Sequence, residues 1–122
     1  MLQHAGIEVS PADLDRTVEF FAILGFTQVP DPFDGGFTWL ESAGTQIHLM
    51  HEDEPTVPPR AHVAVVCPHI DATLARLQEH GFKVERRREY WNEPRALATA
   101  PGGHRVELMS APPPGAPQRF GD

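Results

Sequence analysis

The stretch Ile47-His48-Leu49-Met50 returns 59 residues later as Val106-Glu107-Leu108-Met109. Three further pairs keep nearly the same spacing and the same order along the chain. They are His4 with His62 at 58 residues, Gly25-Phe26 with Gly81-Phe82 at 56, and Gly44 with Gly103 at 59. An ordered series of four matches indicates an internal repeat. We therefore predict one structural unit that occurs twice, over roughly residues 2–50 and 61–110.

Within each half, the residue pattern predicts a strand, a helix and three further strands. Ser10-Pro11 suits a helix start, because serine caps helices and proline fits the first turn, and Gly25 suits the stop. Apolar residues recur at helical spacing between them, and again from Ile70 to Gly81. The predicted strands cover residues 3–9, 26–29, 37–41, 45–50, 62–67, 82–86, 95–99 and 105–110. Since each helix covers one sheet face, we predict an α+β fold in which two βαβββ repeats form curved mixed sheets around a central metal or ligand cavity.

Length and charge limit the remaining choices. The 122 residues fit a single domain, predicted at 1–110, and the proline- and glycine-rich residues 111–122 are predicted to be a disordered tail. A net charge of −7 argues against nucleic-acid and anionic-membrane partners. Cys67 is the only cysteine, and no signal-like or membrane-spanning apolar run is present. A cytoplasmic location is the resulting expectation.

Strand alternation decides which candidate ligands share a sheet face. His4 and His62 begin equivalent strands, while His48 and Glu107 occupy equivalent positions in the last strand of each half. If a pseudo-twofold axis relates the halves, these four side chains converge. The residues that share their faces are expected to line the pocket: Gln46, Met50, Ala64, Val66, Arg105 and Met109.

Imidazoles with one carboxylate suit a divalent first-row metal ion. The repeat favours His4 and His62 as ligands over ordinary strand histidines, and Glu107 between two apolar neighbours needs a partner that a metal supplies. His48 stays open between a fourth ligand and a residue that lines the pocket or hydrogen-bonds a ligand. His51, His69, His80 and His104 are expected to be solvated at loops or helix ends. Residues 86–88, three arginines, are interpreted as a solvated strand end rather than an anion site.

These residues resemble the vicinal oxygen chelate superfamily, which contains glyoxalases, bleomycin-resistance proteins and extradiol dioxygenases. The motifs are His4-Ala-Gly-Ile-Glu-Val, the helix segment 18–26, His62-Val-Ala-Val and the segment 101–108 that ends in Val-Glu107-Leu. The resemblance covers roughly residues 2–110 and places the family's ligands on His4, His62 and Glu107. Its fourth ligand position, glutamate or glutamine in many isomerases, falls on His48. Homodimerisation is a further implication of the resemblance.

The resemblance implies an enzyme that holds Fe, Ni, Zn, Co or Mn and binds a small substrate through two vicinal oxygens. Lyase or isomerase chemistry predicts that His48 coordinates the metal, whereas ring-cleaving dioxygenase chemistry predicts a His-His-Glu site without it. Glu8 and Glu41 are candidate general bases, although each is favoured as a surface carboxylate. The alternative is a metal-free protein that sequesters a drug or metabolite, with aromatic side chains around a cationic planar ligand.

Overall fold

A computed structural model describes residues 1–33 and 35–115. The first half contains β1 (His4–Val9), α1 (Leu14–Ile23), β2 (Thr27–Val29), β3 (Phe37–Ser42) and β4 (Thr45–His51). The second half contains β5 (Val63–Val66), α2 (Ile70–Glu79), β6 (Lys83–Arg87), β7 (Arg95–Thr99) and β8 (Arg105–Met109). Two short 3₁₀ turns, Pro11–Asp13 and Pro101–Gly103, precede α1 and β8. No helix in the described part of the chain is long and apolar enough to cross a bilayer.

Each half forms its own four-stranded mixed sheet. The strand orders are β1-β4-β3-β2 and β5-β8-β7-β6, so the first and last strands of a module pair in parallel and the others are antiparallel. The registers are equivalent as well: Gly6 lies opposite His48, and Ala64 lies opposite Glu107. The predicted α+β fold of two βαβββ modules is therefore confirmed.

Strand alternation separates a helix-facing side from an open side in each sheet. Ile47 and Leu49 are buried on β4, as are Val106 and Leu108 on β8, with exposed fractions of 2% or less. His48 and Glu107, between those pairs, are only partly buried. The apolar side of each strand packs on the helices because that burial removes the most apolar surface from water. The open sides are left to carry the candidate site.

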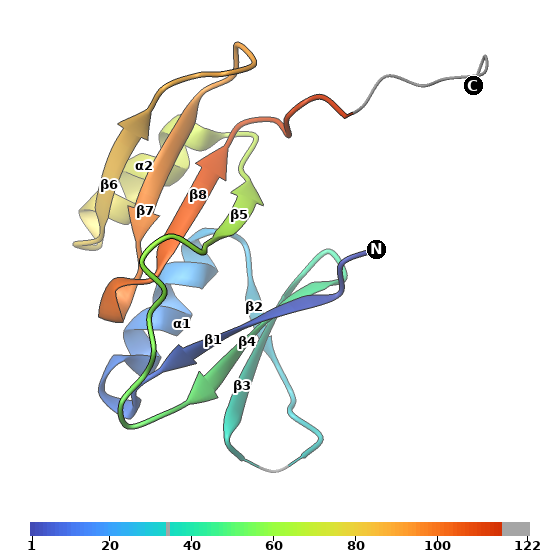
Figure 1. Cartoon of the computed structure of the whole chain (residues 1–122), viewed down its shortest axis with the longest axis vertical. Helices are drawn as coiled ribbons and strands as arrows, with labels where there is room; N and C mark the ends of the chain where they lie inside the picture. The colour runs from blue at the N-terminus through green and yellow to red at the C-terminus, as the bar shows by residue number, and fades with distance from the viewer. Residues whose placement is uncertain (34, 116–122) are drawn as a thin grey trace.

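The two modules share one hydrophobic core through their helices (Figure 1). Phe20 on α1 is fully buried, and its ring meets Phe82, just after α2, edge to face at 5.3 Å. Buried aromatic pairs of this geometry stabilise beyond their area. The helix-to-helix packing therefore fixes the two modules against each other and leaves the open sheet faces on the outside of this core.

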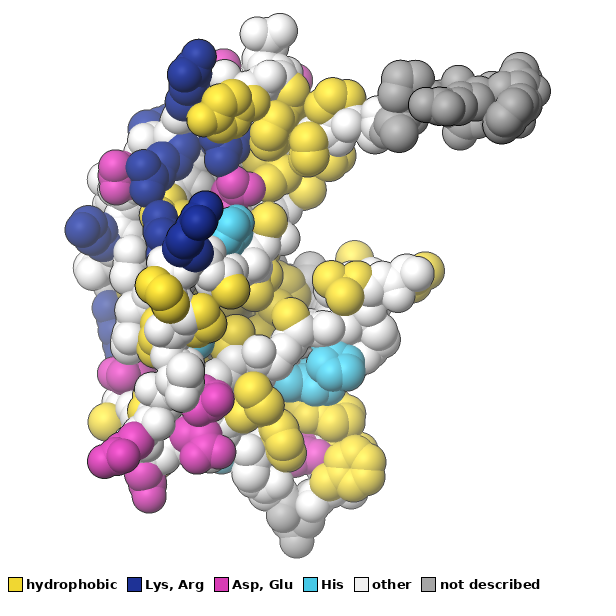
Figure 2. Space-filling view, in the orientation of Figure 1, with side chains coloured by type: hydrophobic (Ala, Val, Ile, Leu, Met, Phe, Trp, Pro, Cys, Tyr) yellow, Lys and Arg dark blue, Asp and Glu magenta, His cyan; other side chains and the backbone are white. Residues whose placement is uncertain are grey.

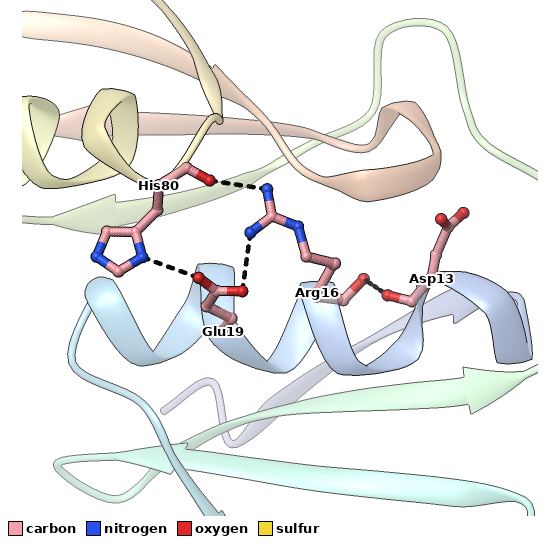
Figure 3. A network of polar contacts seen from close by, with 5 residues as sticks. Asp13, Arg16, Glu19 and His80 are labelled. Atoms are coloured by element: carbon pink, nitrogen blue, oxygen red, sulfur yellow. Dashed lines mark hydrogen bonds and ion pairs between the residues drawn. The ribbon is translucent and has the colours of Figure 1, made fainter.

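A polar network crosses the same helix contact at the surface (Figure 3). Arg16 donates from Nη2 to the carbonyl of His80 at 2.8 Å and pairs through Nη1 with Glu19 at 2.8 Å. His80 Nδ1 lies 2.9 Å from the other oxygen of Glu19. The hydrogen bonds from His80 and Arg16 lower the pKa of the Glu19 carboxyl. These groups are largely exposed, so they orient the contact more than they stabilise it.

Three local features bear on the sequence-based expectations: the start of α1, the ends of two strands, and the C-terminal segment. Ser10 does not cap α1 with its side chain; instead its carbonyl accepts from the N–H of Asp13, and the chain enters α1 through the 3₁₀ turn. His62 precedes β5 rather than forming its first residue, and β4 extends to His51. Residues 111–115 lie outside helices and strands. The remainder of the predicted tail, 116–122, lies outside the described residues.

Candidate functional site

The open face of the first module carries a stack of three flat rings. His4 on β1 and Trp39 on β3 lie on either side of His48 on β4. The His4 and His48 ring centres are 4.1 Å apart at 14°, and those of His48 and Trp39 are 4.5 Å apart at 4°. The register explains the second contact, since Trp39 is the direct cross-strand neighbour of His48. Figure 2 shows histidine side chains exposed on this half.

Hydrogen bonds orient both imidazoles. Gln46 donates from its amide nitrogen to Glu41 at 3.0 Å, so its amide oxygen is the atom that lies 2.7 Å from His48 Nε2. His48 is then the donor through Nε2, and its Nδ1 carries the lone pair. His4 Nδ1 lies 2.6 Å from the side-chain oxygen of Gln3, which leaves its lone pair on Nε2. Burial lowers the pKa of His48, and the neighbouring His4 lowers it further.

The open face of the second module carries the other two predicted ligands. His62 Nδ1 donates to the carbonyl of Arg60 at 2.8 Å, so the lone pair of its ring falls on Nε2. Glu107 accepts from Arg95 on β7 at 2.6 Å through Oε1, and the side chains of this ion pair are only 17% and 13% exposed. His62 and Glu107 line the same cavity, of about 500 Å³.

The four predicted ligands thus form two pairs rather than one group. His4 and His48 line a cavity of about 560 Å³ on the first module, separate from the one that His62 and Glu107 share. Among residues 1–33 and 35–115, no three His, Cys, Asp or Glu side chains lie close enough to hold one ion. Within a single chain, then, His4, His62 and Glu107 do not surround a common point.

Most of the predicted pocket-lining residues do line openings of the molecule. Gln46 adjoins His4 and His48, and Arg105 adjoins His62 and Glu107. Ala64 and Val66 line a crevice along β5, and Met50 lines a second crevice between β1 and the segment before β5. Met109 shares the open face of β8 with Arg105 and Glu107, but it is only 5% exposed and lines none of these four cavities.

The two candidate bases are each tied to a neighbour. Glu8 lines the crevice beside His62, and its Oε1 accepts from the backbone N–H of Thr56 at 3.0 Å. Glu41 accepts from Gln46 and so acts on His48 through that amide. Neither contact assigns a proton-transfer role. Of the two carboxylates, Glu41 is the one linked by hydrogen bonds to a predicted ligand, His48, through Gln46.

The expectation of solvated histidines is wrong for two residues. His104 is 6% exposed, and its Nε2 lies 2.6 Å from the carbonyl oxygen of Glu8, which ties the two modules together. His51 belongs to β4 and its Nε2 lies 2.8 Å from the hydroxyl of Thr38. Alternation carried the missed signal, since His104 shares the parity of Val106 and Leu108. By contrast, His69 and His80 are exposed.

Arg105 was predicted to line the pocket, but sequence reasoning missed the role of other arginines of the second module. Arg95 was not a candidate, although it pairs with Glu107, and its guanidinium lies 5.0 Å from the ring of Tyr90 and 5.4 Å from that of Trp91. Residues 86–88 are exposed as expected, but two of them, Arg87 and Arg88, line the cavity of His62 and Glu107. The available signal was a charged residue, Arg95, at the start of the otherwise uncharged strand β7.

Fold and site together define a protein of paired βαβββ modules whose open sheet faces carry imidazole and carboxylate groups. The chain belongs to the Glyoxalase/Bleomycin resistance protein/Dioxygenase superfamily, whose model matches residues 2–108. A comparison with curated protein sequences found no match.

Solved structures share the fold at low identity. A glyoxalase family protein from Enterococcus faecalis superposes with a TM-score of 0.65 at 20% identity, covering 89% of this chain and 96% of that one. The oxidase ChaP-H2 gives 0.70 at 18% identity, covering 92% and 94%. TnmS3, an antibiotic-binding protein from Streptomyces sp. CB03234, gives 0.66 at 24% identity, covering 89% and 93%. Proteins of this fold thus include both an oxidase and a binder, so the fold alone does not choose between them.

Proposed function

We propose that the protein is a divalent-metal-dependent enzyme of glyoxalase or dioxygenase type, with His4, His62 and Glu107 as metal ligands and, in the lyase or isomerase form of the proposal, His48 as a fourth. One observation carries the proposal: each of these four side chains is held through one polar atom and keeps a second one outside that contact. Metal-binding histidines characteristically use one ring nitrogen for the metal while the other N–H is hydrogen-bonded. The donor set therefore fits a first-row divalent ion.

The proposal requires a second copy of the chain, because one chain keeps the two pairs apart. In a homodimer, the first module of one copy faces the second module of its partner, and the symmetry operation repeats the arrangement at the other end. Charge favours this pairing. Residues 1–59 carry ten Asp and Glu but one Arg, a net charge of −9, whereas residues 60–122 carry nine Lys and Arg and seven Asp and Glu, a net charge of +2. Opposite charges favour contact between unlike modules.

The metal, when bound, would polarise two vicinal substrate oxygens and stabilise the negative charge that develops on them. The chain's own side chains provide the rest of the site. Arg60 and Gln3 fix the rings of His62 and His4, and Gln46, oriented by Glu41, fixes the ring of His48. Lyase or isomerase chemistry would use His48 as a ligand, whereas ring-cleaving dioxygenase chemistry would leave His48 beside a three-ligand iron site.

The aromatic stack favours a second candidate function, a metal-free protein that sequesters a planar ligand. Trp39 and His48 present parallel rings, and Phe33 meets Trp39 edge to face at 6.0 Å. Flat rings of this kind bind planar ligands by stacking. The antibiotic-binding TnmS3 has the same fold. In this function His4 and Trp39, the outer rings of the stack, would contact the ligand, and no ion would be needed.

Elemental analysis of protein purified without added metal or chelator tests the choice. We expect a stoichiometric first-row metal in the wild type, and its loss in His4→Ala, His62→Ala and Glu107→Gln. His69→Ala, an exposed histidine just before α2, is the matched control and should keep the metal. Wild-type protein that takes up none of Fe, Ni, Zn, Co or Mn would overturn the enzyme proposal in favour of the binder.

Mixed dimers test the shared site directly. A dimer of one His4→Ala chain and one Glu107→Gln chain collects both substitutions in one site and leaves the other site wild type, if each site uses two chains. Such a heterodimer should hold about half the wild-type metal. A site formed within one chain predicts none, because every chain in the mixture is then defective.

A further inference from the structure

The cavity that His62 and Glu107 share is strongly basic. It holds about 500 Å³, within the range of small-molecule sites, and opens on the face of β6, β7 and β8. Five arginines line it, with one carboxylate: Arg60, Arg87, Arg88, Arg95 and Arg105, and Glu107. Figure 2 shows Lys and Arg side chains gathered over this half of the molecule. In a chain with a net charge of −7, the arginines are concentrated at one place.

Only part of this positive charge is neutralised by the protein. Arg95 pairs with Glu107, and Arg87 lies 3.6 Å from Glu85. Within the described residues, Arg60, Arg88 and Arg105 enter no ion pair with a carboxylate. Several like charges around one cavity repel one another unless an anion is bound between them. The cavity therefore has the charge of an anion site.

Backbone and ring contacts hold Arg88 and Arg105 in place without neutralising their charge. Arg105 donates from Nη1 to the carbonyl of Pro59 at 3.0 Å. The guanidinium of Arg88 lies 5.5 Å from the ring of Tyr90, which Arg95 approaches from 5.0 Å. Each guanidinium has five N–H donors, and these contacts use one or none of them. Positioned arginines with remaining donors are the side chains that bind carboxylates and phosphates in two-point fashion.

From this arrangement we infer that the cavity binds an oxyanionic group, a carboxylate or a phosphate, of a small molecule. Arg60, Arg88 and Arg105 supply the positive charge that binds the anion. Arg95 holds Glu107 beside the bound anion. The inference deepens the proposed function. It rests on that function only where it takes the bound small molecule to be the substrate of the enzyme. In that case the substrate is an anion whose charged group lies beside the His62 and Glu107 pair.

Calorimetric titration of the full-length protein with inorganic phosphate and with malonate tests the inference. Each titration is made on protein as purified and again in the presence of an uncharged chelator, 1,10-phenanthroline, at constant ionic strength set with chloride. We expect saturable binding of one or both anions under both conditions. The tighter of the two identifies the group as phosphate or carboxylate. Binding that disappears with the chelator would assign the anion to a metal and overturn the inference.

Matched variants locate the site. Arg105→Gln and Arg60→Gln should each weaken the better-bound anion about tenfold or more, since each removes charged hydrogen-bond donors. Arg76→Gln, which makes the same charge change at an exposed position of α2, should leave the affinity unchanged. Arg60 lies outside the helices and strands, so its replacement spares the fold. Equal weakening by Arg76→Gln, or no binding of either anion by the wild type, would refute the inference. Anion binding without metal uptake would contradict the enzyme proposal and leave the present inference in place.

Discussion

Replacing Glu107 with Gln should destabilise the fold even when no metal is present. The Glu107–Arg95 ion pair is 2.6 Å long, and its side chains are 17% and 13% exposed, so water screens it poorly. Removal of one partner from a buried pair leaves an uncompensated charge and costs about 3–5 kcal/mol. Here the rings of Tyr90 and Trp91 still accompany the Arg95 guanidinium, and a Gln oxygen can still accept from it. We therefore expect a loss of about 2 kcal/mol.

Urea unfolding in the presence of a chelator measures this loss, and thermal unfolding should show a fall in Tm of about 8 °C for a chain of this size. Glu79→Gln, an exposed residue near the end of α2, is the control and should change the free energy of unfolding by less than about 0.5 kcal/mol. In a double-mutant cycle, Arg95→Met combined with Glu107→Gln should cost less than the sum of the single changes. A Glu107→Gln variant as stable as the control, or strictly additive losses, would refute the view that this pair is coupled and buried.

Three further predictions concern the contact between the modules. Phe20→Ala should lower the free energy of unfolding by about 3–5 kcal/mol, because the ring is fully buried, while Phe33→Ala, 75% exposed, should change it little; urea unfolding of both variants checks the contrast. His104→Ala should cost about 1–3 kcal/mol, since it leaves a carbonyl of the other module without its hydrogen bond, and a variant of unchanged stability would contradict this. The pKa of Glu19 is lowered in the folded state, chiefly by His80, so its stabilising contribution is present above the unfolded value of about 4.5 and is lost as the pH falls. NMR titration should show the Glu19 pKa return toward its ordinary value in His80→Gln.

The fold was predictable because the two halves repeat at nearly constant spacing. The match of segment 47–50 with 106–109 fixes which strands are equivalent, and alternation then assigns Ile47 and Leu49 to the helix side and His48 to the open side. These are local properties that each short segment carries by itself. The burial of Ile47 at 2% and of Leu49 at 0% confirms them.

The arrangement of the candidate site was less predictable, because it depends on how two complete modules pack. The sequence spacing makes His4 and His62 equivalent but does not specify whether their open faces meet in one chain. In the structure, α1 packs near α2 through Phe20 and Phe82, and this contact sets the two ligand-bearing faces apart. Similarly, nothing local marks Arg95 as the partner of Glu107, since the two residues meet only when β7 pairs with β8.

The parallel pairing of β1 with β4 also determines when the first module can fold. The register joins His4 to Gln46, so the opening strand acquires its hydrogen-bonded neighbour only when a segment more than forty residues later has formed. Contacts of such long sequence separation slow folding, because the chain loses the entropy of loop closure before the contacts contribute any stabilising free energy. During synthesis, β1 is therefore made long before its partner strand β4. The backbone N–H and carbonyl groups that β1 uses in this pairing stay hydrogen-bonded to water until residue 51 has been added. Although β1 precedes β4 in the chain, its pairing is completed only after β4 has been made.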